Sequence, residues 1–354
     1  MSASRYSEAG VDIDAQDEAL AQIKTLARST FGPEVLSDVG HFGGLFQLPL
    51  DGVETPVLVA SADGVGTKLT LARMAGDYST VGLDLVNHCV NDILVQGATP
   101  LFFLDYVGAG VLEPDAVVSL VEGVRAGCVE NGCALLAGET AEMPGFYGAG
   151  DYELVGFILG IVDRPKILDG TRIVPGDILI GLPSSGLHTN GYSLARKIFF
   201  DEQGLALSDP LPGDSSRRVG EALLASHRSY LPSFRRLLDH PALHGLAHIT
   251  GGGLTDNLPR ILPRGMHAAI KVGCWEIPTV FTDLQELGSV DVEEMFRVFN
   301  MGVGMVAVVG AEGTEEILRG LVEGPYPPFI MGSIVDGGSG VVFDLGASPA
   351  PPAS

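Results

Sequence analysis

The feature that most constrains this chain is a short apolar run followed directly by a polar, glycine-containing turn. Val57–Ala60 has the length and composition of a buried β-strand, and it leads into Ser61-Ala62-Asp63-Gly64-Val65-Gly66-Thr67-Lys68. Glycines let backbone N–H groups approach an anion, an aspartate can ligate Mg²⁺, and a lysine can neutralise phosphate oxygens. This pattern predicts a phosphate- and Mg²⁺-binding turn. Its residues are Asp63, Gly64, Gly66, Thr67 and Lys68.

Two other interpretations of this turn were weighed. One is an ordinary strand-to-helix connection with a solvated lysine. The other, a Walker A phosphate loop, is excluded because a single residue separates Gly64 from Gly66.

Composition narrows the class of protein. A length of 354 residues, 46% of them hydrophobic, and 48 glycines predict a globular, loop-rich α/β or α+β protein of two domains. A formal charge of −23 argues against nucleic-acid binding and favours metal dependence at any nucleotide site. The apolar runs are shorter than a membrane span and the N-terminus lacks an apolar signal core, so a cytoplasmic protein is expected. Its four cysteines form no C-x-x-C pair and are expected to be buried, reduced thiols.

A predicted helix over residues 81–96 is apolar almost all round and should be buried. It nevertheless carries Asp84, His88 and Asn91 on one face, with Asp92 on the border of that face. Buried carboxylates are costly unless they are paired or ligate a metal, so a cation shared by Asp84 and Asp92 is the simplest expectation. Capping or local hydrogen bonding is the alternative, and Asn91 and Asp92 are predicted to be functional.

Two further ligand candidates lie nearby in the sequence. A strand at residues 133–137 runs into Gly138-Glu139, where Glu139 is a candidate metal ligand. A helix over residues 17–29 places Lys24 at the edge of its apolar stripe, either snorkelling or directed at a ligand. The glycine-rich stretch 40–46 is either a flap over phosphates or an ordinary connection.

The second half begins after a proline- and glycine-rich boundary at residues 163–177. A strand at 178–182 leads into a loop containing His188, Thr189 and Asn190, ahead of a helix at 194–200, and this arrangement predicts an anion cradle. A loop histidine without a role is the alternative for His188.

Further along, a helix is predicted over residues 218–238, and Gly251 and Gly252 belong to a second glycine loop. His240, His244 and His248 have metal-like spacing. Pro241 and Gly245 break any helix there, so we reject a zinc site.

Long motifs in fixed order resemble the AIR synthetase family, the phosphoribosylformylglycinamidine cyclo-ligases, over about residues 6–345. The motifs are Y-S-E-A-G-V-D-I-D (6–14), D-G-V-G-T-K (63–68), V-N-D-I-L-V-Q-G (90–97), P-L-F-F-L-D-Y (100–106), G-E-T-A-E-M-P-G (138–145), S-S-G-L-H-T-N-G-Y-S-L (184–194), T-G-G-G (250–253) and F-N-M-G-V-G-M (299–305). A selenophosphate synthetase, a hydrogenase-maturation protein and a thiamine-phosphate kinase fit less well. The first would need a reactive cysteine near the N-terminus, the second a C-terminal cysteine, and the third lacks two of these motifs.

The resemblance implies an α+β fold of two domains, with mixed and antiparallel sheets, helices packed on them, and a homodimer formed through the N-terminal-domain sheets. The expected division is residues 1–168, residues 169–346 and a disordered tail at 347–354. The implied activity is ATP-dependent closure of formylglycinamidine ribonucleotide to aminoimidazole ribonucleotide, and the alternative is a non-catalytic nucleotide sensor. ATP and Mg²⁺ are the implied cofactors.

Roles for the candidate residues follow from the resemblance. Asp63, Asp92 and Glu139 would hold the metal, and His188, Asp92 and Lys24 would be catalytic. The nucleotide and phosphate contacts would come from Lys24, Asp63, Gly64, Gly66, Thr67, Lys68, Asn91, Thr189, Asn190, Gly251 and Gly252.

Overall fold

The computed structural model describes residues 13–345, with side chains from residue 19 onward. The chain forms two compact units. The first runs to Ile167 and also takes in residues 207–209 and 218–229, which the sequence division assigned to the second domain. The second unit holds residues 168–206, 210–217 and the chain from Tyr230 onward. The tail expected to be disordered lies outside the described residues.

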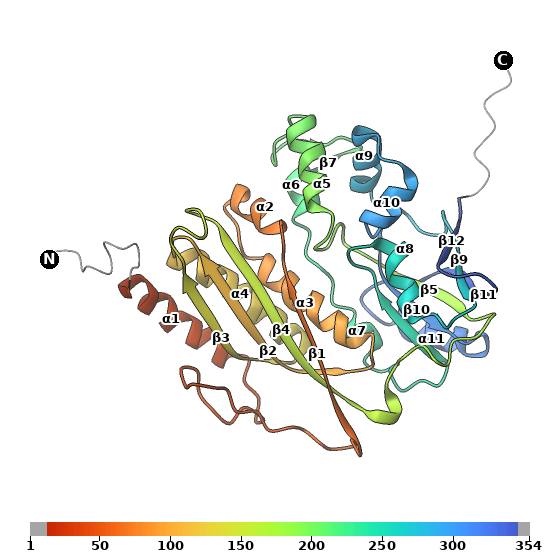
Figure 1. The fold of residues 1–354 in the computed structure, drawn as a ribbon, viewed down its shortest axis with the longest axis horizontal. Coiled ribbons are helices and arrows are strands. Elements are labelled where there is room, and N and C mark those ends of the chain that lie inside the picture. The colour runs from red at the N-terminus through yellow and green to blue at the C-terminus, as the bar shows by residue number, and fades with distance from the viewer. Residues whose placement is uncertain (1–12, 346–354) are drawn as a thin grey trace. The chain divides into compact units, whose positions relative to one another are not determined.

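The first unit is a four-stranded mixed sheet with the strand order β1-β4-β2-β3, and helices cover one of its faces (Figure 1). Only β2 and β3 are parallel to each other; the other neighbours are antiparallel. The elements are α1 (Ile13–Arg28), β1 (Pro56–Gly64), α2 (Lys68–Ala75), α3 (Val81–Leu94), β2 (Thr99–Ala109), α4 (Pro114–Asn131), β3 (Ala134–Glu142), β4 (Tyr152–Asp163), the turn η1 (Arg164–Lys166) and α6 (Val219–Leu223).

Helices α3 and α4 form the layer beneath the sheet. They approach closely because Gly82 has no side chain. A Cβ at this position would lie 2.2 Å from the Leu120 carbonyl oxygen, which is too close for any side chain. Helix α4 begins with Pro114 and ends where Gly132 takes a φ of 70°, which only glycine adopts freely. The apolar side chains of α3 are buried, as the sequence predicts, except for the half-buried Leu83.

One row of residues across this sheet matters for the site. Asp63 on β1 pairs with Gly156 on β4, Gly156 pairs with Asp105 on β2, and Asp105 pairs with Gly138 on β3. Paired residues point to the same face of a sheet, so Asp63 and Asp105 share a face and lie two strands apart, roughly 10 Å.

The prediction of a buried strand at residues 57–60 is only half right. The strand forms, but it is an edge strand with alternating exposure, and Leu58 is 53% exposed. A short apolar run does not reveal whether a strand lies at the centre or at the edge of a sheet.

The second unit is built on a six-stranded mixed sheet with the order β12-β9-β11-β5-β10-β8. Its strands are β5 (Ile178–Pro183), β8 (Leu243–His248), β9 (Met266–Lys271), β10 (Val303–Val309), β11 (Phe329–Asp336) and β12 (Val341–Asp344), with a separate hairpin of β6 (Pro210–Leu211) and β7 (Asp214–Arg218). Its helices are α5 (Tyr192–Arg196), which continues into a π-helical turn η2 (Lys197–Glu202), α7 (Leu231–Phe234), α8 (Gly253–Asn257), η3 (Leu258–Ile261), α9 (Thr279–Gly288), α10 (Val292–Val298), η4 (Ala311–Gly313) and α11 (Thr314–Val322).

The predicted helix over residues 218–238 is wrong. Only the short helices α6 and α7 form, and residues 224–230 between them have no helical structure. The segment instead crosses from the first unit to the second after Ser229. Its polar backbone groups are bound by side chains of α3, a tertiary interaction that periodicity in the sequence does not report.

Candidate functional site

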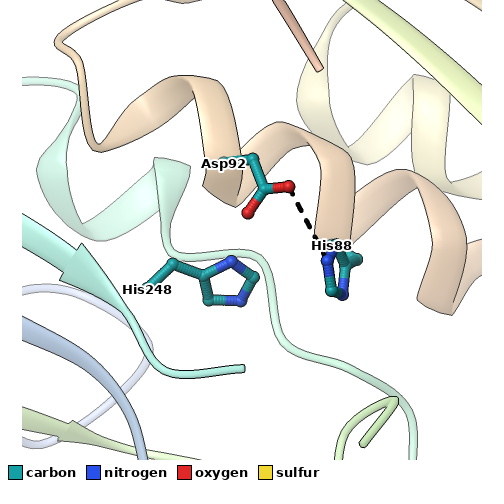
Figure 2. Close-up of side chains that lie close together, drawn as sticks. All are labelled: His88, Asp92 and His248. Atoms are coloured by element: carbon teal, nitrogen blue, oxygen red, sulfur yellow. Dashed lines mark ion pairs between the residues drawn. The ribbon is translucent and has the colours of Figure 1, made fainter. Parts of the chain in front are cut away.

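Two carboxylates of the first unit converge on one histidine. Asp63, at the end of β1, lies 2.8 Å from Nε2 of His88, and Asp92, one turn further along α3, lies 3.7 Å from the same atom. Figure 2 shows His88 and Asp92 projecting from α3, with the ion pair between them. The Ser61 hydroxyl donates a hydrogen bond of 3.0 Å to Asp92 Oδ2. The predicted partnership of Asp63 and Asp92 therefore has a geometric basis in the fold.

The electrostatics of this cluster favour charged forms. Burial raises the pKa of Asp63, but the hydrogen bond and charge of His88 outweigh it, and the net pKa is lowered. Burial lowers the pKa of His88, and the carboxylates outweigh it in turn, so that pKa is raised. The Asp63 side chain is 44% exposed and that of Asp92 26%, so both can reach a ligand from solvent. Two accessible carboxylates with a neighbouring hydroxyl are oxygen donors of the type that Mg²⁺ prefers.

The sequence predicted that Lys68 binds phosphate, and the structure places its side chain differently. Its side chain is fully buried, with Nζ 2.6 Å from Asp84 Oδ2 and donating to the Ala225 carbonyl at 2.9 Å. Burial lowers the pKa of Lys68 and raises that of Asp84, while each partner's charge opposes the shift in the other. The ammonium faces the interior and not a phosphate, and the charge partner of Asp84 is this lysine and not a shared cation.

Asn91, predicted to contact the nucleotide, is bonded within the first unit. It is fully buried, and its amide nitrogen donates to the Arg228 carbonyl at 2.8 Å and lies 3.2 Å from His227 Nε2. Asp84 accepts from the His227 N–H at 2.6 Å. Together these contacts hold residues 227–228 against α3.

The turn after β1 keeps its predicted character at the remaining positions. Asp63 Oδ1 accepts from the Gly64 N–H at 2.7 Å. Gly66 takes a φ of 63°, and nothing lies within 4 Å of a Cβ placed on it. Gly66 and Thr67 are exposed just ahead of α2. This turn can therefore present backbone N–H groups to an anion.

A cavity of about 290 Å³ lies elsewhere in the first unit, beside the edge strand β3. Lys24 from α1, Glu139 from β3 and the glycine loop 38–44 line it together with apolar side chains. The ammonium of Lys24 packs against Gly40, since a Cβ there would lie 3.4 Å from its Nζ. The structure thus joins Lys24, the glycine loop and Glu139 around one cavity, a grouping that the sequence did not indicate.

Glu139 does not complete the metal site that was predicted with Asp63. Strands β1 and β3 form opposite edges of the sheet, with β4 and β2 between them. Three strand spacings separate the two residues, roughly 14 Å, which exceeds what two ligands of one ion can span. Local sequence placed both acids after apolar strands, but only the strand order shows that they lie apart.

In the second unit, His188 is fully buried and takes a φ of 61°. Its Nε2 accepts a hydrogen bond of 3.2 Å from the Ser185 N–H, and its carbonyl accepts from the Tyr192 hydroxyl at 2.9 Å. A Cβ on Gly304 would lie 2.7 Å from the ring, so that glycine makes room for it. The ring of this histidine, which the sequence predicted to contact substrate, is therefore closed off from solvent and bonded within its own loop.

Two buried asparagines position the neighbouring loops. Asn300 accepts from Ser184 Oγ at 2.9 Å and donates to the Gly186 carbonyl at 2.8 Å. Asn257 donates to the Gly251 and Gly253 carbonyls at 3.1 and 2.9 Å. The two loops meet where a Cβ on Gly251 would lie 3.1 Å from Asn190 Oδ1. Thr189, Asn190, Gly251 and Gly252 therefore lie on adjoining, partly exposed loops, as an anion cradle requires.

Several residues of these sites were missed or given no role from the sequence. Asn300 belongs to the motif at 299–305 and Ser61 to the turn 61–68, and neither was assigned a role. His88, on the predicted helix over residues 81–96, and Asn257, just beyond the glycine loop, were likewise given none. Asp105 interrupts the buried alternation of Phe103 and Val107 on β2, and an acid on the inward face of a strand was a signal that could have been used. In the histidine run, His244 pairs with Asp177 at 2.7 Å and His240 with Glu316 at 3.3 Å.

Comparisons with known proteins place the chain in a family. The family models "AIR synthase related protein, N-terminal domain" and "AIR synthase related protein, C-terminal domain" match residues 50–162 and 174–344. The phosphoribosylformylglycinamidine cyclo-ligase of Trichlorobacter lovleyi is 54% identical over 89% of this chain and 90% of its own length. The protein of the same name from Bacillus cereus is 48% identical over 97% and 99%.

Solved structures share the fold at lower identity. Thiamine-monophosphate kinase from Stenotrophomonas maltophilia superposes with a TM-score of 0.68 at 20% identity, over 92% of this chain and 96% of that one. The hydrogenase maturation protein HypE in complex with ATP superposes with a TM-score of 0.61 at 20% identity, over 88% and 84%. These likenesses confirm the predicted two-domain α+β fold, and the sequence relatives decide among its members. The chain belongs to the phosphoribosylformylglycinamidine cyclo-ligase family, a family of ligases of purine biosynthesis.

Proposed function

We propose that this protein closes formylglycinamidine ribonucleotide to aminoimidazole ribonucleotide, with conversion of ATP to ADP and phosphate. The observation that carries the proposal is the match to ligases of that name at about half identity over nine-tenths of the chain. ATP bound by the structural neighbour HypE supports a nucleotide site in this fold. The chain has no helix, within residues 13–345, that is long and apolar enough to cross a bilayer. We propose a cytoplasmic enzyme.

The reaction requires that the negative charge of the triphosphate be neutralised and that the γ-phosphoryl group be positioned against the formamide oxygen. A formamide oxygen is a poor leaving group; transfer of the γ-phosphoryl group to it lets it leave as phosphate when the amidine nitrogen attacks the carbon. Phosphoryl transfer of this kind depends mainly on alignment and electrostatic stabilisation. Mg²⁺, when bound, would neutralise triphosphate oxygens, and Asp63 and Asp92 would hold it.

The remaining roles are divided between the two units. In the first, the turn at Gly66 and Thr67 would bind phosphate oxygens, Gly64 would hold Asp63 in place through its N–H, and Lys24 would contribute a cation at the cavity. In the second, Thr189 and Asn190 with Gly251 and Gly252 would bind an anionic group of the ribonucleotide. His188 would position that loop without touching the reacting atoms.

Enzyme and nucleotide sensor differ in what ADP release requires. We expect steady ADP release only when the formylamidine ribonucleotide is present, in a one-to-one ratio with the aminoimidazole product measured directly. A coupled ADP assay and a colorimetric assay of the amine, run on the same samples, check this ratio. ADP release without the ribonucleotide, or tight ATP binding with no turnover in its presence, would contradict the proposed ligase.

We also propose a homodimer formed through the sheet of the first unit. Helices cover only one face of that sheet, and the opposite face is apolar: Leu58 and Phe157 are 53% and 42% exposed, with Leu159 and Phe102 half-buried beside them. A solvated sheet face normally carries polar side chains, so an apolar face indicates a partner surface. A second copy supplies a matching face by symmetry, and sheet-on-sheet packing would bury both.

The dimer has a direct test. The double change Leu58→Asp/Phe157→Asp should convert the protein to a monomer in sedimentation velocity, because two buried charges per protomer would lie in the interface. The matched control is Val322→Asp on α11, a 68% exposed position of the second unit, which should leave the mass unchanged. A wild type that sediments as a monomer at micromolar concentration would refute the proposal.

A further inference from the structure

A buried carboxyl at the cavity beside β3 has no role in the mechanism above. Asp105 lies on β2, is 9% exposed and lines that cavity. Its Oδ1 packs against Gly138, where a Cβ would lie only 1.9 Å away, so this carboxyl position requires a glycine on the neighbouring strand. Within residues 19–345, where side chains are described, none pairs with it.

The rest of the cavity has the lining of a site for a mostly apolar group. Leu20 and Ile23 from α1, Val121 from α4, and Leu112 and Leu136 give it apolar walls. Its volume of about 290 Å³ lies near the lower end for small-molecule sites and suits one ring system better than a whole nucleotide. A Cβ on Gly44 would lie 2.4 Å from Leu136, so the glycine loop packs directly on one wall. Lys24 adds a cation at the same cavity.

We propose that this cavity takes the adenine base of the nucleotide, and that Asp105 recognises its N1 and 6-amino edge. The inference rests on the proposed use of ATP and adds a specificity-determining residue to it. A protonated carboxyl donates to N1 and accepts from the 6-amino group at the same time, whereas an ionised carboxyl can only accept.

The environment of Asp105 supports the protonated form. Burial raises the pKa of Asp105 to about 7, and a backbone hydrogen bond opposes that shift. The titratable groups around it are Lys24 on α1, Asp38 and His41 in the loop, Cys128 on α4 and Glu139 on β3. Asp38 is paired with Arg28 at 2.6 Å. Glu139 lines the cavity from β3, but it pairs in register with Tyr106, so its side chain leaves the sheet on the face opposite to that of Asp105. The buried Cys128 thiol has a raised pKa and stays neutral.

Binding of Mg·ATP and of the triphosphate of purine riboside, which lacks the 6-amino group, tests the inference by calorimetry on the full chain without the second substrate. For the wild type at pH 6.5 we expect the analogue to bind about 10-fold more weakly, the size of one buried hydrogen bond. Asp105→Leu should weaken ATP by about 10-fold or more and bind both nucleotides equally. This loss of discrimination is a coupling that general damage to the fold does not produce.

The pH dependence supplies a second readout. ATP affinity of the wild type should fall as pH rises from 6 to 8.5, because Asp105 loses the proton that it donates to N1. Asp105→Asn keeps one donor and one acceptor without titrating. At pH 6.5 its ATP affinity should therefore stay within about 3-fold of that of the wild type, and above pH 6.5 it should lack the fall in affinity that ionisation of Asp105 causes in the wild type. Asp163→Asn is the matched control, a carboxyl-to-amide change at an 8% exposed position of the same unit that bonds Thr55; it should keep both the discrimination and the pH dependence.

Each outcome supports or contradicts the role of Asp105 separately from the proposed activity. If Asp105→Leu still discriminates ATP from the analogue, or binds ATP as tightly as the wild type, the cavity does not hold the base in this way. Nucleotide binding that depends on Asp105, in a chain that does not cyclise the formylamidine, would leave the inference standing and remove the proposed activity. Cyclisation by Asp105→Leu with normal ATP affinity would leave the proposed activity standing and remove the inference about Asp105.

Discussion

Replacement of Lys68 by methionine is expected to lower the free energy of unfolding by about 3–5 kcal/mol, because it leaves the buried Asp84 carboxylate without its charge partner. The two side chains are 2.6 Å apart with no solvent exposure, so water cannot compensate for the lost ammonium. Urea unfolding at pH 7 measures the change. The same variant tests the earlier prediction from sequence: a phosphate-binding lysine would lose ATP affinity at nearly unchanged stability.

The second variant of this pair is Lys68→Met/Asp84→Asn. The amide removes the buried charge while its oxygen can still accept from the His227 N–H, so the double variant should recover a substantial part of the lost stability. Equal stability of Lys68→Met and the wild type would mean that the pair is not buried in solution. A double variant less stable than Lys68→Met would show that the Asp84 charge has a further partner.

The second large effect is expected at Asp92 and Asp63. Asp92→Asn and Asp63→Asn should each lower kcat by about 10²–10³-fold, the loss typical of one placed group that stabilises transition-state charge. Both should also raise the Mg²⁺ concentration needed for half-maximal rate, because an amide is a weaker ligand for a hard cation than a carboxylate. Initial rates across a Mg²⁺ titration at saturating ATP separate the two effects.

The choice of control makes this test specific. Asp151→Asn changes a half-exposed carboxylate of the same unit that pairs with Arg73 at the surface, and it should leave the Mg²⁺ dependence as in the wild type. Glu139→Gln decides between one three-ligand site and two separate ones. If it raises the Mg²⁺ requirement as much as Asp92→Asn does, Glu139 binds the same ion as Asp92, contrary to the separation of β1 and β3 across the sheet.

The amino-acid sequence by itself determined the family, the class of chemistry and most of the regular elements. Motifs such as Asp63–Lys68 and Ser184–Leu194 are contiguous, so they can be recognised in the sequence without knowledge of the tertiary structure. The burial of helix α3 is predictable because its apolar composition on almost all sides is a local property, and its acids were correctly expected to need partners.

Only the tertiary structure decided which groups meet. The partner of Asp84 is Lys68, Asp63 and Asp92 converge on His88, and Glu139 lies on the far edge of the sheet. Strand order and register bring Asp105 and Gly138 together, and neither can be derived from local patterns. The turn that began as a phosphate loop around Lys68 thus keeps its aspartate and glycines for the ligand. Its lysine turns inward, because a buried carboxylate 16 residues along the chain holds it there.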